Sequence, residues 1–130
     1  MVKNMIFFII FLMGCSSQKN CNTLQDLKSS EIKQFINESK IDIYENIYRF
    51  GECKVESAIP FLVKELSNKK ISHSTKYKGM SIRYVANIAL SKITNSNYFF
   101  KQTDSEEIKN RIIQSWIDYI EKSSNLNMKM

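Results

Sequence analysis

The chain is poor in the residues that build turns, with three glycines and one proline among 130 residues. Folds made of many short strands need frequent tight turns, and those turns favour glycine and proline. The sequence therefore disfavours a turn-rich β architecture. Hydrophobic residues make up 43% of the chain and aromatic residues 12%. Because this is enough apolar material for a packed core, bulk disorder is disfavoured as well.

Residues that carry chemistry are equally scarce. The single histidine, His73, lies in a polar, lysine-rich stretch, and no nucleophile and base can be grouped around it. No CxxC pair or Cys/His cluster offers ligands to zinc, and isolated glycines form no phosphate-binding loop. Glu106 and Glu107 are adjacent, so on a helix they face different directions. We predict no catalytic residue, no cofactor and no metal, and a protein that is not an enzyme.

The net charge of +6 would attract anionic partners. The lysines are spread along the chain, with one denser stretch at residues 69–78. No predicted helix carries a basic stripe with interleaved aromatics, so nucleic-acid binding is disfavoured. A solvated lysine surface is the simplest interpretation. The alternative is an anionic glycan or lipid bound by this stretch. Its candidate partner-binding residues are Lys69, Lys70, Lys76, Tyr77 and Lys78.

One apolar run stands near the start of the chain. It extends over nine residues, from Met5 to Met13, after a positive start at Lys3. A helix needs about 20 residues to span a hydrocarbon core of ~30 Å, so this run is too short. It has the length of the apolar segment of a secretory signal, typically ~7–15 residues. A small residue, Gly14, and then Cys15 follow it.

The segment LMGC, residues 12–15, resembles the lipobox of bacterial lipoprotein signal peptides. Met13 is a less usual residue at its position in that family. The resemblance implies that residues 1–14 are removed, that Cys15 receives a diacylglycerol and that its new amine is acylated, with palmitate as a typical chain. Several acyl chains hold a protein firmly to a membrane. Ser16 stands where the family's inner-membrane retention signal has aspartate, which implies the outer membrane, facing the periplasm.

Two cysteines remain if Cys15 is lipidated. Cys21 lies in a polar stretch, residues 16–23, and Cys53 follows the segment YRFGE. An even remainder in an oxidising compartment permits one disulfide between Cys21 and Cys53. Two free thiols are the alternative. Since residues 15–23 contain nothing to pack, we interpret them as a lipidated, flexible tether.

The rest of the chain has apolar residues at helical spacing, which predicts an all-α domain over residues 24–124. Residues 67–79 are predicted to form a polar loop, and residues 125–130 a disordered tail. Ser29 or Ser30 is expected to cap the first helix and Ser105 the last. Gly51 is expected to end a helix, and Pro60 to lie in a first turn. The predicted helices cover residues 29–39, 41–51, 57–66, 80–94 and 105–124.

Two neighbouring segments resemble HEAT-like, armadillo-type helical repeats. The first carries a glycine and an acidic residue at a helix end, then an Ala-Ile-Pro-x-Leu helix; the second carries an arginine before an alanine-rich stripe. The matching residues are Gly51, Glu52, Ala58, Ile59, Pro60, Leu62 and Leu66, and then Arg83, Ala86, Ala89, Leu90 and Ile93. The resemblance implies a short HEAT-like α-solenoid capped by its first and last helices. An irregular compact helical bundle is the alternative.

These features together favour a membrane-anchored, non-catalytic module for protein–protein interaction in the cell envelope. The anchor is the lipid on Cys15, and the partner is expected to be another envelope protein. An envelope binder of anionic glycan or lipid, acting through residues 69–78, is the second hypothesis. Neither the partner's identity nor the oligomeric state follows from the sequence.

Overall fold

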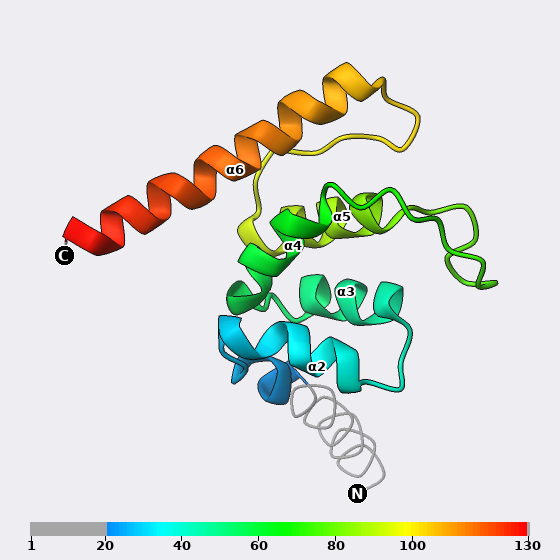
Figure 1. Ribbon diagram of the computed structural model, residues 1–130, viewed down its shortest axis with the longest axis horizontal. Helices are drawn as coiled ribbons and strands as arrows, with labels where there is room; N and C mark the ends of the chain where they lie inside the picture. The colour runs from blue at the N-terminus through cyan, green and yellow to red at the C-terminus, as the bar shows by residue number, and fades with distance from the viewer. Residues whose placement is uncertain (1–20, 130) are drawn as a thin grey trace, which may run out of the picture.

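The computed structural model describes residues 21–129, with side chains as far as residue 125, and this part of the chain is all-helical (Figure 1). The all-α prediction is therefore confirmed. Within the described range the one β-type pairing is an isolated antiparallel bridge between Ile71 and Ser81. The signal segment and Cys15 lie outside the described residues. A short helical segment at 21–25 precedes η1 (Ser29–Glu31), α2 (Ile32–Glu38), α3 (Ile43–Glu52), η2 (Glu56–Ala58), α4 (Ile59–Glu65), α5 (Ile82–Thr94) and α6 (Glu106–Lys129).

Helices α3 and α5 lie side by side and run in the same direction. Their N-terminal ends both reach Lys70, whose carbonyl accepts hydrogen bonds from the Tyr44 hydroxyl (3.1 Å) and the Ile82 amide (2.9 Å). Their C-terminal ends are joined by an ion pair between Glu52 and Lys92. Helix α4 lies between α3 and α5 in the sequence and packs against α5. It carries the chain from the C-terminal end of α3 back toward the N-terminal ends of α3 and α5.

Gly51 has a different role from the one that the sequence indicated. It lies inside α3, which continues to Glu52. A Cβ atom at Gly51 would stand 2.8 Å from the Cα of Ala89 and 3.1 Å from its Cβ. The two helix backbones therefore touch here, and a glycine is required because only hydrogen fits between them. The left-handed turn residue after α3 is Lys54, with φ of 52°.

The core lies between α3, α4 and α5. The apolar stripe predicted for residues 82–93 is buried along its length, and Pro60 lies in the first turn of α4 as predicted. The fully buried large side chains of these helices include Ile47, Phe50, Leu62, Leu66 and Leu90. Burying a side chain of this size contributes roughly 1.5–3 kcal/mol, so these side chains make a large contribution to the stability of the fold.

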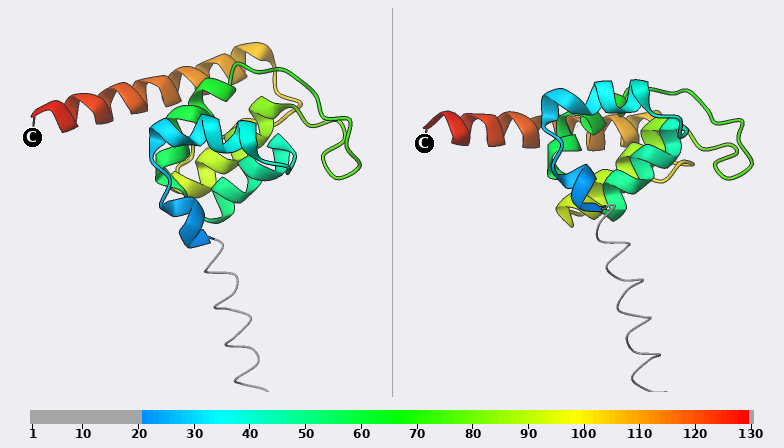
Figure 2. Two further views of the ribbon diagram at one scale, coloured as in Figure 1. Left: turned by 60° about the horizontal axis from the view of Figure 1, so that its bottom comes forward. Right: turned by 90° about the horizontal axis from the view of Figure 1, so that it is seen from below.

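Helix α6 lies along one side of this three-helix unit (Figure 1) and extends past it, as both views of Figure 2 show. Trp116 is its single fully buried apolar side chain among those described. The isoleucines of its apolar face are half-buried, except Ile108, which is 40% exposed. The helix continues to Lys129, beyond residue 124 where the sequence led us to end the domain. Neither glycine nor proline occurs after Trp116, so no residue stops it.

The helix caps were predicted correctly in one case of two. The Ser105 hydroxyl accepts a hydrogen bond from the Ile108 amide (3.3 Å) at the start of α6. Neither Ser29 nor Ser30 caps the first helix. Instead the Lys28 amide donates to the Glu31 carboxylate (2.9 Å), and the Ser29 hydroxyl donates to the Ser57 carbonyl (2.8 Å). The Ser29 hydroxyl thereby holds η1 against η2, the short helix that leads into α4.

Candidate functional site

The lysine-rich segment, residues 69–78, forms most of the excursion between α4 and α5. Its base is closed like a hairpin, because the Ser72 amide donates to the Met80 carbonyl (2.9 Å) next to the bridge between Ile71 and Ser81. The segment projects from the N-terminal ends of α3 and α5, at the right of Figure 1. It is a loop, as predicted, but its base is fixed by backbone hydrogen bonds.

Tyr77 is not available as a surface contact, in contrast to our interpretation of the sequence. It is 7% exposed, and its ring stacks on that of Tyr44 with centroids 5.9 Å apart. Its hydroxyl donates a short hydrogen bond to Glu45. Burial, reinforced by this carboxylate, raises the pKa of Tyr77 above its usual range, so the ring stays neutral. Tyr77 therefore anchors the loop to α3.

The four lysines of the segment fall into two kinds. Lys76 is paired with Glu45 (2.8 Å), and the hydrogen bond from Lys76 lowers the pKa of the Glu45 carboxyl. Lys69 is paired with Glu106 (3.5 Å). Lys70 and Lys78 are exposed, and their ammonium groups have no carboxylate partner among the described side chains. Lys70 and Lys78 are therefore the lysines of this segment whose charges are unpaired among the described side chains, whereas Lys69 and Lys76 are exposed but paired.

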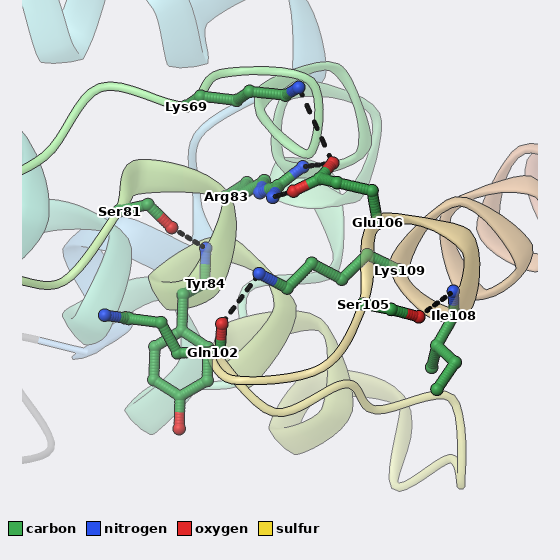
Figure 3. Close-up of polar contacts among 9 residues, drawn as sticks. All are labelled: Lys69, Ser81, Arg83, Tyr84, Gln102, Ser105, Glu106, Ile108 and Lys109. Atoms are coloured by element: carbon green, nitrogen blue, oxygen red, sulfur yellow. Dashed lines mark hydrogen bonds and ion pairs between the residues drawn. The ribbon is translucent and has the colours of Figure 1, made fainter.

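A polar cluster joins the starts of α5 and α6 (Figure 3). Arg83 is buried, and its guanidinium donates hydrogen bonds to both carboxylate oxygens of Glu106, one at 3.1 Å and the other closer. This bidentate contact lowers the pKa of Glu106 to about 2. Lys109 is also buried and donates to the Gln102 carbonyl (2.7 Å). Each charged group has a partner, so this cluster fastens α6 to α5 and does not form an open site.

The structure shows no assembled catalytic group in the part of the chain that it describes. His73 is exposed. Glu106 is held by Arg83, and Glu107 by Arg111 at 3.3 Å. No group of three or more histidine, cysteine, aspartate or glutamate side chains within this part could hold a metal ion.

Cys21 and Cys53 are joined by a disulfide, with Cα atoms 5.1 Å apart. The Gln25 side chain also donates to the Cys53 carbonyl (2.6 Å). The disulfide fixes the start of the described chain to the turn after α3. It lies at the C-terminal ends of α3 and α5, whereas the lysine-rich segment leaves from their N-terminal ends. The disulfide and the unpaired Lys70 and Lys78 therefore lie at opposite ends of the three-helix unit.

A groove that the sequence did not reveal runs between α6 and the η1–α2 and α4 segments. Two adjoining hollows of about 320 and 310 Å³ share Ser29, Pro60 and Ile120, so they form one depression. Its floor is apolar around Pro60, Phe61 and Ile120. Phe61 lies off the helical stripe that buries Leu62 and Leu66. An apolar side chain outside the buried stripe was the signal available in the sequence.

A second hollow, of about 460 Å³, lies against the C-terminal half of α6. It is lined by Tyr98, Tyr119 and polar side chains that include Asp118 and Lys122. Tyr98 and Tyr119 both meet the buried ring of Trp116 edge-on, with centroids 5.2 and 5.7 Å away. Both tyrosines remain about two-fifths exposed. Because Tyr119 and Ser123 also line the groove, this hollow and the groove adjoin along the C-terminal half of α6.

By its fold, the described part of the chain belongs to the all-α class. No protein-family model, no curated protein and no solved structure matches this chain. None of the described helices is both long enough and apolar enough to cross a membrane.

Proposed function

We propose that this protein is a lipid-anchored, non-catalytic module that binds another protein of the cell envelope. The observation that carries the proposal is the open apolar surface of α6. Tyr119 on α6 and Tyr98 in the loop before it are each about two-fifths exposed and line one hollow together, and Tyr119 also lines the adjoining groove. Clustered apolar surface of this kind marks interaction sites, and tyrosine is favoured as an interface anchor.

The helical domain is, in this proposal, a short HEAT-like array. Two facts support it: α3 and α5 run in the same direction, and the intervening α4 returns the chain between them. Stacked hairpins of a solenoid have this order, and their exposed faces serve as extended binding surfaces. The segment 21–38 and helix α6 then cover the two ends of the array. An irregular helical bundle is the alternative for the same elements.

The anchor in this proposal is the lipid on Cys15, at the outer membrane and facing the periplasm. Cys21 lies six residues further along, and its disulfide to Cys53 ties it to the helical body. A fully extended chain spans at most about 3.6 Å per residue. The body is therefore held within roughly 20 Å of its lipid, with the C-terminal ends of α3 and α5 nearest to the membrane.

Binding of an anionic glycan or lipid through residues 69–78 is the weaker candidate. The exposed, unpaired Lys70 and Lys78 favour it. Against it stand the buried ring of Tyr77 and the ion pairs of Lys69 and Lys76. The position of the segment, at the end of α3 and α5 away from the disulfide, also turns these lysines away from an anchor at Cys15.

Two measurements test the proposal. Cys15→Ala should release the protein from the membrane fraction and abolish the mass of the attached lipid; unchanged fractionation would overturn the anchor. In cells, a photo-reactive residue in place of Tyr119 should crosslink to one defined envelope protein. A residue of the same kind at Lys78 should not. Crosslinking at Lys78 alone, lost at high salt, would replace this proposal with the anionic-ligand one.

A further inference from the structure

The two halves of the groove beside α6 carry opposite charge. At one half, Lys33 and Lys64 stand around the apolar floor of Pro60, Phe61 and Ile120. Both lysines are exposed, and neither ammonium group is paired with a carboxylate among the described side chains. At the other half, Glu56 lies opposite Tyr119 and the serines 123 and 124.

We propose that this groove binds a short amphipathic segment of the partner protein whose carboxylates meet Lys33 and Lys64. The inference rests on the proposed protein-binding function and names the chemistry of its ligand. The segment places its large apolar side chains on the floor formed by Pro60, Phe61 and Ile120. The two unpaired lysines at the rim then gain charged hydrogen-bond partners. Complementary rim charges fix the register of such a segment more than they raise its affinity.

The opposite half of the groove sets the direction of the bound segment. Glu56 is exposed and has no basic partner among the described side chains. A carboxylate of the ligand would be repelled there, and a lysine or arginine would be attracted. The favoured ligand therefore has acidic residues at one end and a basic or neutral residue at the other, with apolar residues between them.

A peptide fits the lining better than a single lipid molecule does. An anionic headgroup could reach Lys33 and Lys64, but its acyl chain would continue along Ile120 toward Glu56, Ser123 and Ser124. Those polar side chains stand beside Ile59 and Tyr119, so an acyl chain laid there would bury a carboxylate and hydroxyl groups without giving them hydrogen-bond partners. The same serines can exchange hydrogen bonds with the backbone or polar side chains of a peptide. The mixed lining thus favours a chain that alternates apolar and polar groups.

The test selects peptides on the mature protein without assuming a partner. A displayed library of random peptides of about 16 residues, enough for four helical turns, is selected on the wild-type chain. Enriched peptides should combine acidic residues at one end with large apolar residues next to them and a basic or neutral residue at the other end. One synthetic peptide from the selection then serves as the probe, and its affinity is measured for the wild type and two charge-matched double variants.

The groove variant is Lys33→Gln with Lys64→Gln, and its control is Lys70→Gln with Lys78→Gln. Both remove two exposed, unpaired lysines. The groove variant should lose about three- to tenfold in affinity, as expected for two partly exposed charge pairs. The control should stay within about twofold. Circular dichroism must show the same helix content for both, which the exposure of all four side chains favours.

Four outcomes would overturn the inference. The enriched peptides could lack carboxylates, or both double variants could lose affinity equally, which would indicate unspecific charge attraction. Vesicles of phosphatidylcholine and phosphatidylglycerol could displace the peptide from the groove, which would identify a lipid ligand. Association of the chain with a second copy, abolished by the groove variant, would identify a homodimer. If the Tyr119 crosslink forms but the groove variant binds the peptide as tightly as the wild type does, the protein-binding function stands while this inference fails.

Discussion

The contact between α3 and α5 and the seat of α6 show two different ways of packing a helix. In the first, glycine and alanine bring two backbones together, and the apolar stripes on both sides are fully buried. In the second, one tryptophan and a set of ion pairs hold a long helix whose isoleucines remain half-exposed. The first arrangement gives the body its stability. The second leaves apolar surface of α6 exposed and docks the helix less tightly.

The largest effect is expected at the point where α6 is docked. Trp116→Ala removes the helix's fully buried anchor, and truncations of this size cost about 3–5 kcal/mol. We expect the amides of α6 to lose protection from hydrogen exchange while those of α3 and α5 keep theirs. Trp116→Phe is the matched control, because the indole N–H has no hydrogen-bond partner among the described residues. Equal loss of protection in all three helices would show that α6 is part of the same cooperative unit.

The disulfide between Cys21 and Cys53 ties the start of the described chain to the end of α3, one of the two closely packed helices. It closes a loop with a sequence separation of 32 residues, and removing a bridge of this length costs about 3–4 kcal/mol by the chain-entropy argument. Cys21→Ser with Cys53→Ser should therefore lower the free energy of unfolding by about that amount, measured by urea denaturation. The same change should appear in the wild type under reducing conditions. If a reductant destabilises the wild type but leaves the double variant unchanged, the loss of stability comes from the disulfide itself.

Gly51→Ala tests the backbone contact between α3 and α5 directly. Alanine is the better helix former by about 0.5–1 kcal/mol, so propensity alone predicts stabilisation. The new methyl group would meet the Cα of Ala89 at 2.8 Å, and a backbone atom cannot move aside. Overpacking of this kind costs typically about 1–3 kcal/mol. We expect a net decrease in the urea midpoint.

The partner substitution decides whether that decrease comes from the contact itself. Ala89→Gly removes the Cβ atom that lies 3.1 Å from the same methyl position. The double variant should therefore be more stable than the two single changes predict when added. A Gly51→Ala protein as stable as the wild type would mean that the two backbones separate easily, and the contrast with α6 would be lost.

The predictions that succeeded depend on local periodicity, and the others depend on distant partners. The buried face of residues 82–93 and the first-turn position of Pro60 follow from spacing and from proline's missing N–H group. Tyr77 is buried because its ring meets Tyr44, 33 residues earlier, which no local pattern indicates. The groove likewise requires segments from both ends of the domain. Phe61, apolar but off the buried stripe, was its one local sign.

The smallest effect concerns the ion pair that holds the start of α6. Arg83 lowers the pKa of Glu106 to about 2 in the folded protein, whereas an unfolded glutamate titrates near 4.3. A lowered folded-state pKa contributes stability above the unfolded value, and this contribution is lost as the pH falls from about 4.3 toward 2. Glu106→Gln should therefore flatten the dependence of the urea midpoint on pH in this window and leave it unchanged in slope above it. Glu107→Gln is the control, because Glu107 pairs with an exposed arginine of its own helix. Should both variants follow the wild-type curve, Arg83 would not be the contact that holds α6 to α5, and Trp116 alone would account for the docking.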